Sequence, residues 1–294
     1  MFTLKSFLAR LWLRAVHLSL VPFSDRTKAW LLEQVAMTET PKVERLTRHG
    51  PIHFHCPGAL PFWRADTLLT KEPDTIAWLD SLPENSVLWD VGANVGVYTL
   101  YAARAGCRVI AFEPCINNYE LLCRNLALNG LEERTQAFCL AFSDTTRTGV
   151  LNLPSTQAGS ALLQFGERQD TVEVLNQQAA VVFRQMSLGY APDEFLAAFD
   201  PSFPAAMKID VDGLEHAIIA GAAKIFTDER FRTLLVELDM RETNITEQTL
   251  ERIEAAGLRL TSLAAAALAD KRKAGETCNL IFWKQAAPHG KADT

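Results

Sequence analysis

The chain has 294 residues, of which 48% are hydrophobic and 22% charged, which is typical of a soluble protein with one large domain, alone or with an appendage. Its net charge of −6 disfavours general binding to nucleic-acid phosphates, because like charges repel. None of the six cysteines forms a CxxC pair, a usage typical of a reducing compartment, so we expect a cytoplasmic protein without a disulfide framework.

The N-terminal segment 7–23 is apolar but contains Arg10, Arg14 and His17, which share one face of a predicted helix. No run of about 18 uncharged apolar residues occurs, so we expect no membrane-spanning helix. Two interpretations stay open for this segment. We favour a helix docked on the core of the protein. The other is a helix on the inner membrane surface, which would make residues 1–23 a peripheral membrane contact.

Residues 1–80 predict a helix, a loop and a second helix, with Gly and Pro clustered around residues 53–57. From Ser86 onward, short apolar runs bounded by Asn or Gly predict strands, and longer amphipathic runs predict helices. Residues 143–203 are expected to be irregular, with hairpins and a short helix near 192–199. The remaining expected elements are strands 87–91, 108–112, 136–142, 207–211, 233–238, 258–262 and 280–284, and helices 97–105, 116–128, 215–225 and 246–256.

This alternation predicts an α/β, Rossmann-like fold, with a mostly parallel seven-stranded sheet covered by helices on both faces. The last strand follows no helix long enough for a parallel crossover, so we expect 280–284 to insert antiparallel beside the fifth strand. The expected domains are a helical N-terminal extension at 1–68, an α/β domain at 69–284 and a disordered tail at 285–294.

The strongest motif is DVGANVG at residues 90–96, between a buried strand and a helix. Ligands bind at the carboxyl ends of such strands, and Gly92 and Gly96 let the backbone approach a ligand closely. The GxxxG spacing lacks the arrangement of a pyrophosphate-binding loop. Asp90 instead suits the cationic amino-acid end of S-adenosylmethionine. A plain tight turn explains the glycine pair alone equally well.

Two further sites follow the next strands. Glu113 ends the second strand, 23 residues after Asp90, where a carboxylate can accept hydrogen bonds from both ribose hydroxyls of a nucleoside. Ser143 and Asp144 follow the third strand and could flank an adenine ring. A turn with a side-chain cap explains Ser143 and Asp144 equally well.

The runs LWDVGANVGVYT, FEPCINNYELLCRNLALNG and MKIDVDGLEHAIIAGA resemble the FkbM family of methyltransferases, over roughly residues 69–262. The resemblance also includes residues 71–75 and 159–161. It implies the class I methyltransferase fold, S-adenosylmethionine as cofactor and methyl transfer to oxygen, often on sugars or secondary metabolites. By position, Asp90, Gly92, Gly96 and Glu113 match the cofactor motif of the family. The full expected cofactor site adds the turn residues Ala93 and Asn94, Asn118 as the helix residue nearest Glu113, and Ser143 and Asp144.

Polar residues crowd the end of the fourth strand, where a base could take the proton of an acceptor hydroxyl. The catalytic candidates are Asp210, Asp212, Glu215 and His216. Asp210 and Asp212 point to the same side if the strand continues that far. Stabilisation of the first helical turn explains Glu215 equally well, and an ordinary exposed position explains His216. We expect Asp210 to matter most.

Glu237 and Asp239 end the fifth strand, and oxygen ligands of this kind suit Mg²⁺. We favour a hydrogen-bonded acid pair that stabilises the loops, and we name no metal ligand.

The expected function is O-methylation of a sugar, glycan or secondary metabolite. The main alternative is a non-catalytic partner protein that retains the fold, but this would predict a degenerate glycine loop. A NAD-dependent dehydrogenase would need the glycine fingerprint that is missing. No cluster of aromatic and basic residues indicates base stacking, so we expect no nucleic-acid partner.

Overall fold

The structure is a computed structural model that describes residues 2–161, 164–174, 177–241, 243–261 and 277–285. Its internal contacts divide the chain into two units, Met1–Pro41 and Lys42–Thr294. Residues 42–68, which the sequence places in the N-terminal extension, are therefore described with the second unit. The expected tail at 285–294 lies outside the described residues, apart from Gln285.

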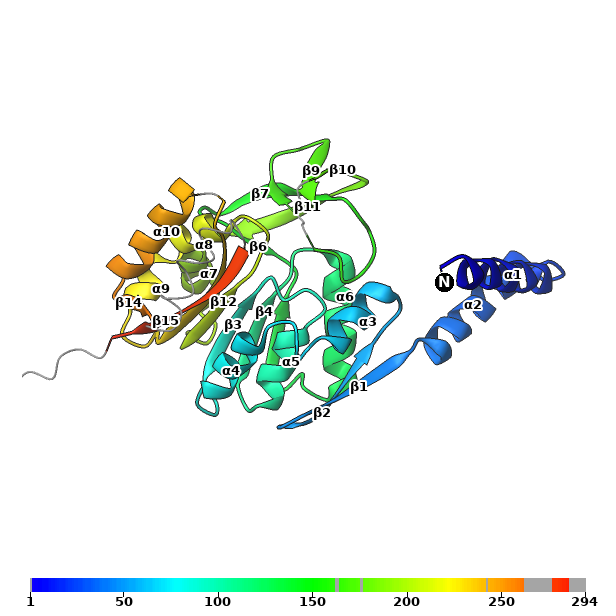
Figure 1. Cartoon of the computed structure of the whole chain (residues 1–294), viewed down its shortest axis with the longest axis horizontal. Coiled ribbons are helices and arrows are strands. Elements are labelled where there is room, and N and C mark those ends of the chain that lie inside the picture. Colours follow the sequence, from blue (N-terminus) through cyan, green and yellow to red (C-terminus); the bar gives the residue numbers. More distant parts are fainter. Residues whose placement is uncertain (1, 162–163, 175–176, 242, 262–276, 286–294) are drawn as a thin grey trace, which may run out of the picture. The chain divides into compact units, whose positions relative to one another are not determined.

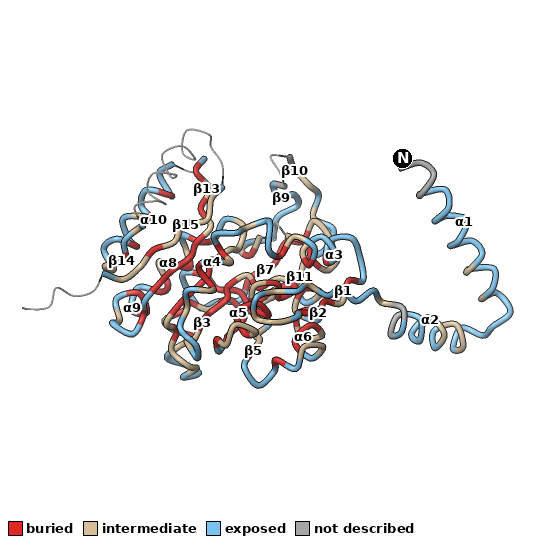
Figure 2. Tube along the Cα trace, turned by 60° about the horizontal axis from the view of Figure 1, so that its bottom comes forward, coloured by how far each residue is buried: buried red, intermediate tan, exposed pale blue. Residues whose placement is uncertain are grey.

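The N-terminal unit consists of the helices α1 (Phe2–Leu20) and α2 (Asp25–Glu39). Ser24 caps α2, because its hydroxyl oxygen accepts the N–H of Thr27. Both helices appear mostly as exposed segments in Figure 2. Neither they nor any other helix in the described ranges is long and apolar enough to cross a membrane.

A hairpin and two helices precede the main sheet. The strands β1 (Lys42–Thr47) and β2 (Gly50–His55) pair antiparallel, and α3 (Ala59–Asp66) and α4 (Pro73–Ser81) follow. The prediction of a loop around residues 53–57 is therefore wrong for residues 53–55, which belong to β2. Ile52 and Phe54 are buried on one side of β2, and this alternation is a strand pattern that the flanking Gly and Pro residues obscure.

The main sheet has seven strands, in the order β14-β15-β13-β12-β3-β4-β5 (Figure 1). Its strands are β3 (Val87–Val91), β4 (Arg108–Phe112), β5 (Thr135–Phe138), β12 (Ala206–Ile209), β13 (Thr233–Asp239), β14 (Leu258–Leu260) and β15 (Thr277–Lys284). β15 runs antiparallel to β13, which confirms the expected insertion beside the fifth strand. The strand order reverses between β3 and β12, and ligands of such sheets bind at this switch point.

Helices cover both faces of the sheet, as expected for this fold class. α3, α4, α5 (Val97–Arg104) and α6 (Ile116–Asn129) pack with Leu88 of β3 on one face. Trp89, the next residue, packs on the other face with α7, α8, α9 and α10. The bounds of these four are Pro192–Phe199, Glu215–Gly221, Ala223–Thr227 and Thr243–Ala255. Successive residues of a strand point to opposite faces of the sheet, so Leu88 contributes to one apolar core and Trp89 to the other.

Three expected elements differ from the structure. The expected strand 136–142 is divided, because β5 pairs with β4 whereas β6 (Ala141–Phe142) pairs with β11 in a second sheet. The expected helix 215–225 is interrupted at Ala222, whose φ of −108° and ψ of 18° are not helical. The expected strand 207–211 ends at Ile209, before Asp210.

The short helix expected near 192–199 is confirmed as α7, but the segment before it is more regular than expected, because it contributes to a second sheet in the order β6-β11-β7-β8. A separate hairpin pairs β9 with β10. The strands are β7 (Arg147–Leu153), β8 (Gln164–Gly166), β9 (Thr171–Val174), β10 (Gln177–Ala180) and β11 (Phe183–Tyr190).

Candidate functional site

The glycine turn connects β3 to α5 at the switch point of the sheet. Gly92 has a φ of +82°, and a Cβ atom there would lie 1.8 Å from the carbonyl oxygen of Asp210. The N–H groups of Gly92 and Ala93 both donate to the carbonyl of Phe112 at the end of β4. The turn is thus packed between the end of β4 and the end of β12, the strands on either side of β3, where a side chain at residue 92 has no room.

Asp90 is a buried carboxylate with one oxygen unused. Its side chain is 1% exposed, and its Oδ2 accepts the hydroxyl of Thr99. Its Oδ1 is buried and has no hydrogen-bond partner among the described residues. Burial raises the pKa of Asp90, although Lys208 opposes this shift. An unsatisfied buried acceptor of this kind calls for a donor, and a cationic donor would remove the cost of burying its charge.

Glu113 connects the glycine turn to α6. Its Oε2 accepts the N–H of Asn94 at 2.8 Å, and its Oε1 accepts the N–H of Cys115 at 2.9 Å and Nδ2 of Asn118 at 3.3 Å. Burial raises the pKa of Glu113 to about 7, against the effect of these hydrogen bonds. The structure therefore brings Glu113, Asn94 and Asn118 together, as the sequence predicts.

The segment around Gly159 and Ser160 lies against these residues. The Ser160 carbonyl accepts Nδ2 of Asn94 at 2.8 Å and Nδ2 of Asn118 at 3.1 Å. The Gly159 N–H donates to Oδ1 of Asn118, and its carbonyl accepts Nε of Arg64 at 2.7 Å. This segment and α3 are thus connected to the glycine turn through polar side chains.

Lys208 is a buried cation in the middle of the sheet. Its side chain is 2% exposed, and its Nζ lies 2.8 Å from Oδ2 of Asp210 and 5.2 Å from the ring centroid of Tyr98. Burial alone would lower the pKa of Lys208, but Asp210, Asp90 and Glu72 raise it, so Lys208 remains protonated. Burial would likewise raise the pKa of Asp210, but Lys208 lowers it below its usual value.

Two further carboxylates complete this acidic cluster. Glu72, at the start of α4, accepts Nζ of Lys71, the Thr75 hydroxyl and Nδ2 of Asn279. Glu237 of β13 has its pKa raised to about 8, first by burial and then by the neighbouring carboxylate of Asp210. Glu72, Asp90, Asp210 and Glu237 thus surround Lys208, and the two whose pKa is lowered, Glu72 and Asp210, carry the negative charge that compensates it.

The loop after β12 separates the catalytic candidates. Asp210 forms an ion pair with Lys208. Asp212 has a φ of +60°, which is not strand geometry, so the side-chain alternation of a strand does not apply to these two acids. The Glu215 carboxylate accepts the N–H of Val211 at 3.1 Å and of Gly213 at 3.0 Å, and thereby fixes the loop. Burial raises the pKa of Glu215 to about 7. His216 is exposed on α8.

Ser143 and Asp144 form a small turn after β6. Ser143 is fully buried, and its hydroxyl lies 3.0 Å from Oδ1 of Asp144, which is itself exposed. Asp144 also accepts the hydroxyl of Thr145, so these bonds of its carboxylate join neighbouring side chains and cap no backbone group. Contact of these residues with an adenine ring stays a prediction.

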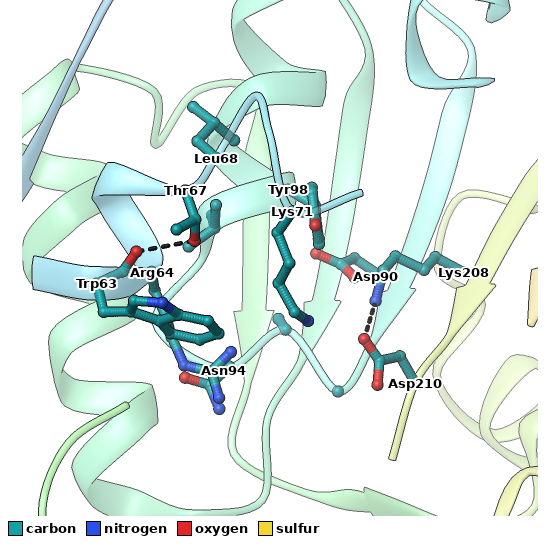
Figure 3. Close-up of a pocket in the computed structure, with 13 residues that line it drawn as sticks. Trp63, Arg64, Thr67, Leu68, Lys71, Asp90, Asn94, Tyr98, Lys208 and Asp210 are labelled. Carbon is teal, nitrogen blue, oxygen red and sulfur yellow. Dashed lines mark hydrogen bonds and ion pairs between the residues drawn. The ribbon is translucent and has the colours of Figure 1, made fainter. Parts of the chain in front are cut away.

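A small cleft, partly open to solvent, lies between the strand ends and α3 (Figure 3). Its walls include residues that the sequence predicts and residues that it does not. The predicted ones are Asp90, Gly92, Ala93, Asn94 and Asp210, and the others are Trp63, Arg64, Thr67, Leu68, Lys71, Val97, Tyr98 and Lys208. The other candidates, Gly96, Glu113, Asn118, Ser143, Asp144, Asp212, Glu215 and His216, do not line it.

Some of the missed residues had a signal in the sequence. Lys208 is a lysine inside an otherwise apolar strand, and a buried lysine needs a compensating carboxylate. Lys71 lies in one of the segments that carry the family resemblance. Trp63 and Arg64 have no such signal, because nothing local predicts that α3 contacts the strand ends.

No group of three or more His, Cys, Asp or Glu side chains within the described ranges has the geometry of a metal site. Asp239, one of the two acids at the end of β13, is instead paired with Arg241.

A family model described as "Methyltransferase FkbM domain" matches residues 90–260. Methyltransferase sdnD of Sordaria araneosa is 27% identical over 165 residues, which are 48% of this chain and 62% of that protein. The chain thus spans less than two thirds of that relative. Among solved structures, a Methyltransferase FkbM from Methylobacillus flagellatus matches with a TM-score of 0.41 and 14% identity, over 75% of this chain and 53% of that one. Fibrillarin from Aeropyrum pernix, in complex with S-adenosyl-L-methionine, matches with a TM-score of 0.43 and 11% identity, over 82% of each chain.

Proposed function

Because the chain belongs to the FkbM family of methyltransferases, we propose that it transfers a methyl group from S-adenosylmethionine to a hydroxyl of a sugar, a glycan or a secondary metabolite. This proposal is carried by Asp90, a residue of the cleft wall whose buried Oδ1 has no partner among the described residues. A ligand ammonium group would satisfy this atom.

The residues at the strand ends fit this cofactor. When bound, S-adenosylmethionine supplies a methyl group on a cationic sulfur. Asp90 would bind the ammonium group of the ligand, and the ionised carboxylate of Asp210 would stabilise the positive charge of the sulfur. Glu113 Oε2 accepts one hydrogen bond within the described residues, so it retains a lone pair for a ribose hydroxyl. Ser143 and Asp144 lie at the adenine end.

Asp210 is the residue that we assign to the acceptor. Lys208 holds its carboxylate in the ionised form, so Asp210 can accept a hydrogen bond from the acceptor hydroxyl. Asp210 would accept the hydroxyl proton, while S-adenosylmethionine would supply the methyl group and leave as S-adenosylhomocysteine when its methyl–sulfur bond breaks. A carboxylate with a lowered pKa is a weak base, so most of its effect comes from aligning the oxygen with the methyl group.

Cofactor binding is tested by titrating S-adenosylhomocysteine into the wild type, Asp90→Asn and Glu113→Gln in a calorimeter. We expect each substitution to weaken binding about tenfold or more, the loss of a charge-assisted hydrogen bond of about 1.5–3 kcal/mol. Glu251→Gln is the matched control, because Glu251 is exposed on α10. Unchanged affinity in both variants would refute the site. A wild type that binds no cofactor would favour the non-catalytic alternative.

The acceptor atom is tested with ¹³C-methyl S-adenosylmethionine and a panel of sugars and hydroxylated small molecules. We expect labelled methyl ethers, which survive mild alkali. Methyl esters, which mild alkali hydrolyses, or methylated amines would contradict transfer to a hydroxyl.

A further inference from the structure

Two cations, Arg64 of α3 and Lys71 immediately before α4, line the cleft together with the strand-end acids. Figure 3 shows Lys71 reaching into the space between Trp63 and the Lys208–Asp210 pair, with Arg64 close to Asn94. Both cations contribute to lowering the pKa of Asp210, and Arg64 acts on Glu113 as well. The positive charges are therefore close enough to the cofactor residues to act on one bound molecule.

Arg64 uses one edge of its guanidinium group for a hydrogen bond and has donors left at the other edge. Its Nε donates to the Gly159 carbonyl at 2.7 Å. Its two terminal nitrogens make no hydrogen bond or ion pair within the described ranges, and its side chain is half-buried. A guanidinium group presents a planar set of donors that matches a carboxylate or phosphate.

Lys71 is also only partly used. Its Nζ forms an ion pair with Glu72 and lies 6.0 Å from the ring centroid of Trp63. An ammonium group has three donors, so donors remain after the bond to Glu72. Its side chain is 42% exposed, so a ligand in the cleft can reach it.

We propose that Arg64 and Lys71 form an anion subsite that binds a carboxylate or phosphate group of a small molecule in the cleft. Asp90, whose buried Oδ1 has no partner among the described residues, lines the same cleft, so the cleft combines a carboxylate with cations that have unused donors. This charge pattern is complementary to a zwitterion. The anion comes either from the α-carboxylate of the cofactor or from an acidic acceptor, so the assignment rests on the proposed function.

The first arm of the test separates the two ends of the cofactor. S-adenosylhomocysteine and 5′-methylthioadenosine, which lacks the amino-acid end, are titrated into the wild type, Arg64→Gln and Lys71→Gln. If the cofactor supplies the anion, each substitution weakens S-adenosylhomocysteine at least about tenfold and leaves 5′-methylthioadenosine within about twofold. Lys224→Gln, which removes an exposed charge on α9, is the matched control.

The second arm detects an anion that comes from the acceptor. Inorganic phosphate is titrated into the complex with S-adenosylhomocysteine. If the acceptor supplies the anion, the wild-type complex binds phosphate, both variants lose this binding, and their affinity for S-adenosylhomocysteine is unchanged. Variants that match the wild type in both arms would overturn the subsite.

Two controls keep the outcomes distinct. Arg64→Gln also removes the bond to Gly159, so if its melting temperature falls strongly, Lys71→Gln alone decides. If the wild type does not bind S-adenosylhomocysteine, the proposed function fails, whereas phosphate binding to the free protein, lost in Lys71→Gln, still supports the subsite.

Discussion

Lys208 has a structural role that can be separated from catalysis. It is buried among Asp90, Asp210 and Glu72, and removing one partner of a buried ion pair leaves the other charge uncompensated. We predict that Lys208→Met lowers the free energy of unfolding by about 3–5 kcal/mol in urea denaturation. Lys224→Met, at an exposed position, should stay within about 0.5 kcal/mol. A loss at Lys208 as small as that of the control would show that the cluster does not depend on this cation.

Asp210 and His216 lie in the same short segment of the sequence but differ in position, since Asp210 lines the cleft and His216 does not. We predict that Asp210→Asn lowers kcat by about 10²-fold or more, the loss expected when the acceptor oxygen is misaligned, with cofactor affinity within a few fold. His216→Ala should leave kcat nearly unchanged. Steady-state kinetics with an accepted substrate and calorimetry with S-adenosylhomocysteine measure the two quantities. Parallel losses of kcat and affinity in Asp210→Asn would place Asp210 at the cofactor instead.

Glu237 makes the stability of the fold depend on pH. Its folded pKa of about 8 lies above the ordinary value of 4.5, so the native state retains a proton that the unfolded chain has released. Its contribution to stability is therefore complete below pH 4.5 and is lost as the pH rises through about 8.

We predict that the melting temperature of Glu237→Gln, measured relative to that of the wild type, is higher at pH 8.5 than at pH 5. The gain should be several degrees, because about 1 kcal/mol shifts the melting temperature by about 2–4 °C in a domain of this size. Thermal denaturation at both pH values measures it. Parallel curves for the two proteins would contradict a raised pKa at Glu237.

At the scale of elements, the turn after β3 has the least tolerance for a side chain. In Gly92→Ala the new Cβ would lie 1.8 Å from the Asp210 carbonyl, whereas at Gly130 nothing lies within 4 Å, although both residues have positive φ. We predict a loss of about 3 kcal/mol or more for Gly92→Ala, from backbone strain and overpacking together. Gly130→Ala should lose only about 1–2 kcal/mol, from the backbone alone. Equal losses in urea denaturation would mean that the turn can shift away from Asp210.

The sequence predicts the bounds of β3 and β4 because short apolar runs bounded by Gly or Asn have one plausible structure. It misses β2, whose alternation of buried Ile52 and Phe54 is masked by the neighbouring Gly and Pro residues. The division between β5 and β6 also has no local signal. One apolar run supplies both strands, and only the pairing with β11 assigns β6 to another sheet.

The candidate site divides in the same way. Asp90, Glu113 and Asp210 are predictable because parallel strands bring their carboxyl ends to one edge of the sheet. Arg64 and Trp63 are not, because their position depends on how α3 packs against that edge. Glu215 is ambiguous in sequence, and only its hydrogen bonds to Val211 and Gly213 show that it stabilises the loop.

At the scale of the whole chain, the N-terminal unit leaves apolar surface uncovered by its own helices. Phe7, Leu11, Trp12 and Leu18 of α1 are exposed, between 47% and 68%. An apolar patch of this kind requires a partner, either the second unit or a membrane surface. We expect docking. Deleting residues 1–23 should then lower the melting temperature of the second unit, and the intact chain should not float with anionic liposomes.

Arg10→Glu/Arg14→Glu is the matched variant for this experiment, because it reverses the basic face and keeps the apolar residues. Each Lys or Arg near an anionic surface contributes about 1 kcal/mol. Flotation that disappears with salt, with the deletion and with the double variant would contradict docking and assign α1 to the membrane.

The central claim is that the cleft beside the glycine turn binds S-adenosylmethionine with its methyl group near Asp210. Ultraviolet cross-linking with S-adenosylmethionine tritiated in the methyl group tests this without knowledge of the acceptor. We predict label in the peptides that contain Tyr98 or residues 207–212, and suppression of that label by excess S-adenosylhomocysteine. Label in other peptides, or label that S-adenosylhomocysteine does not suppress, would contradict it.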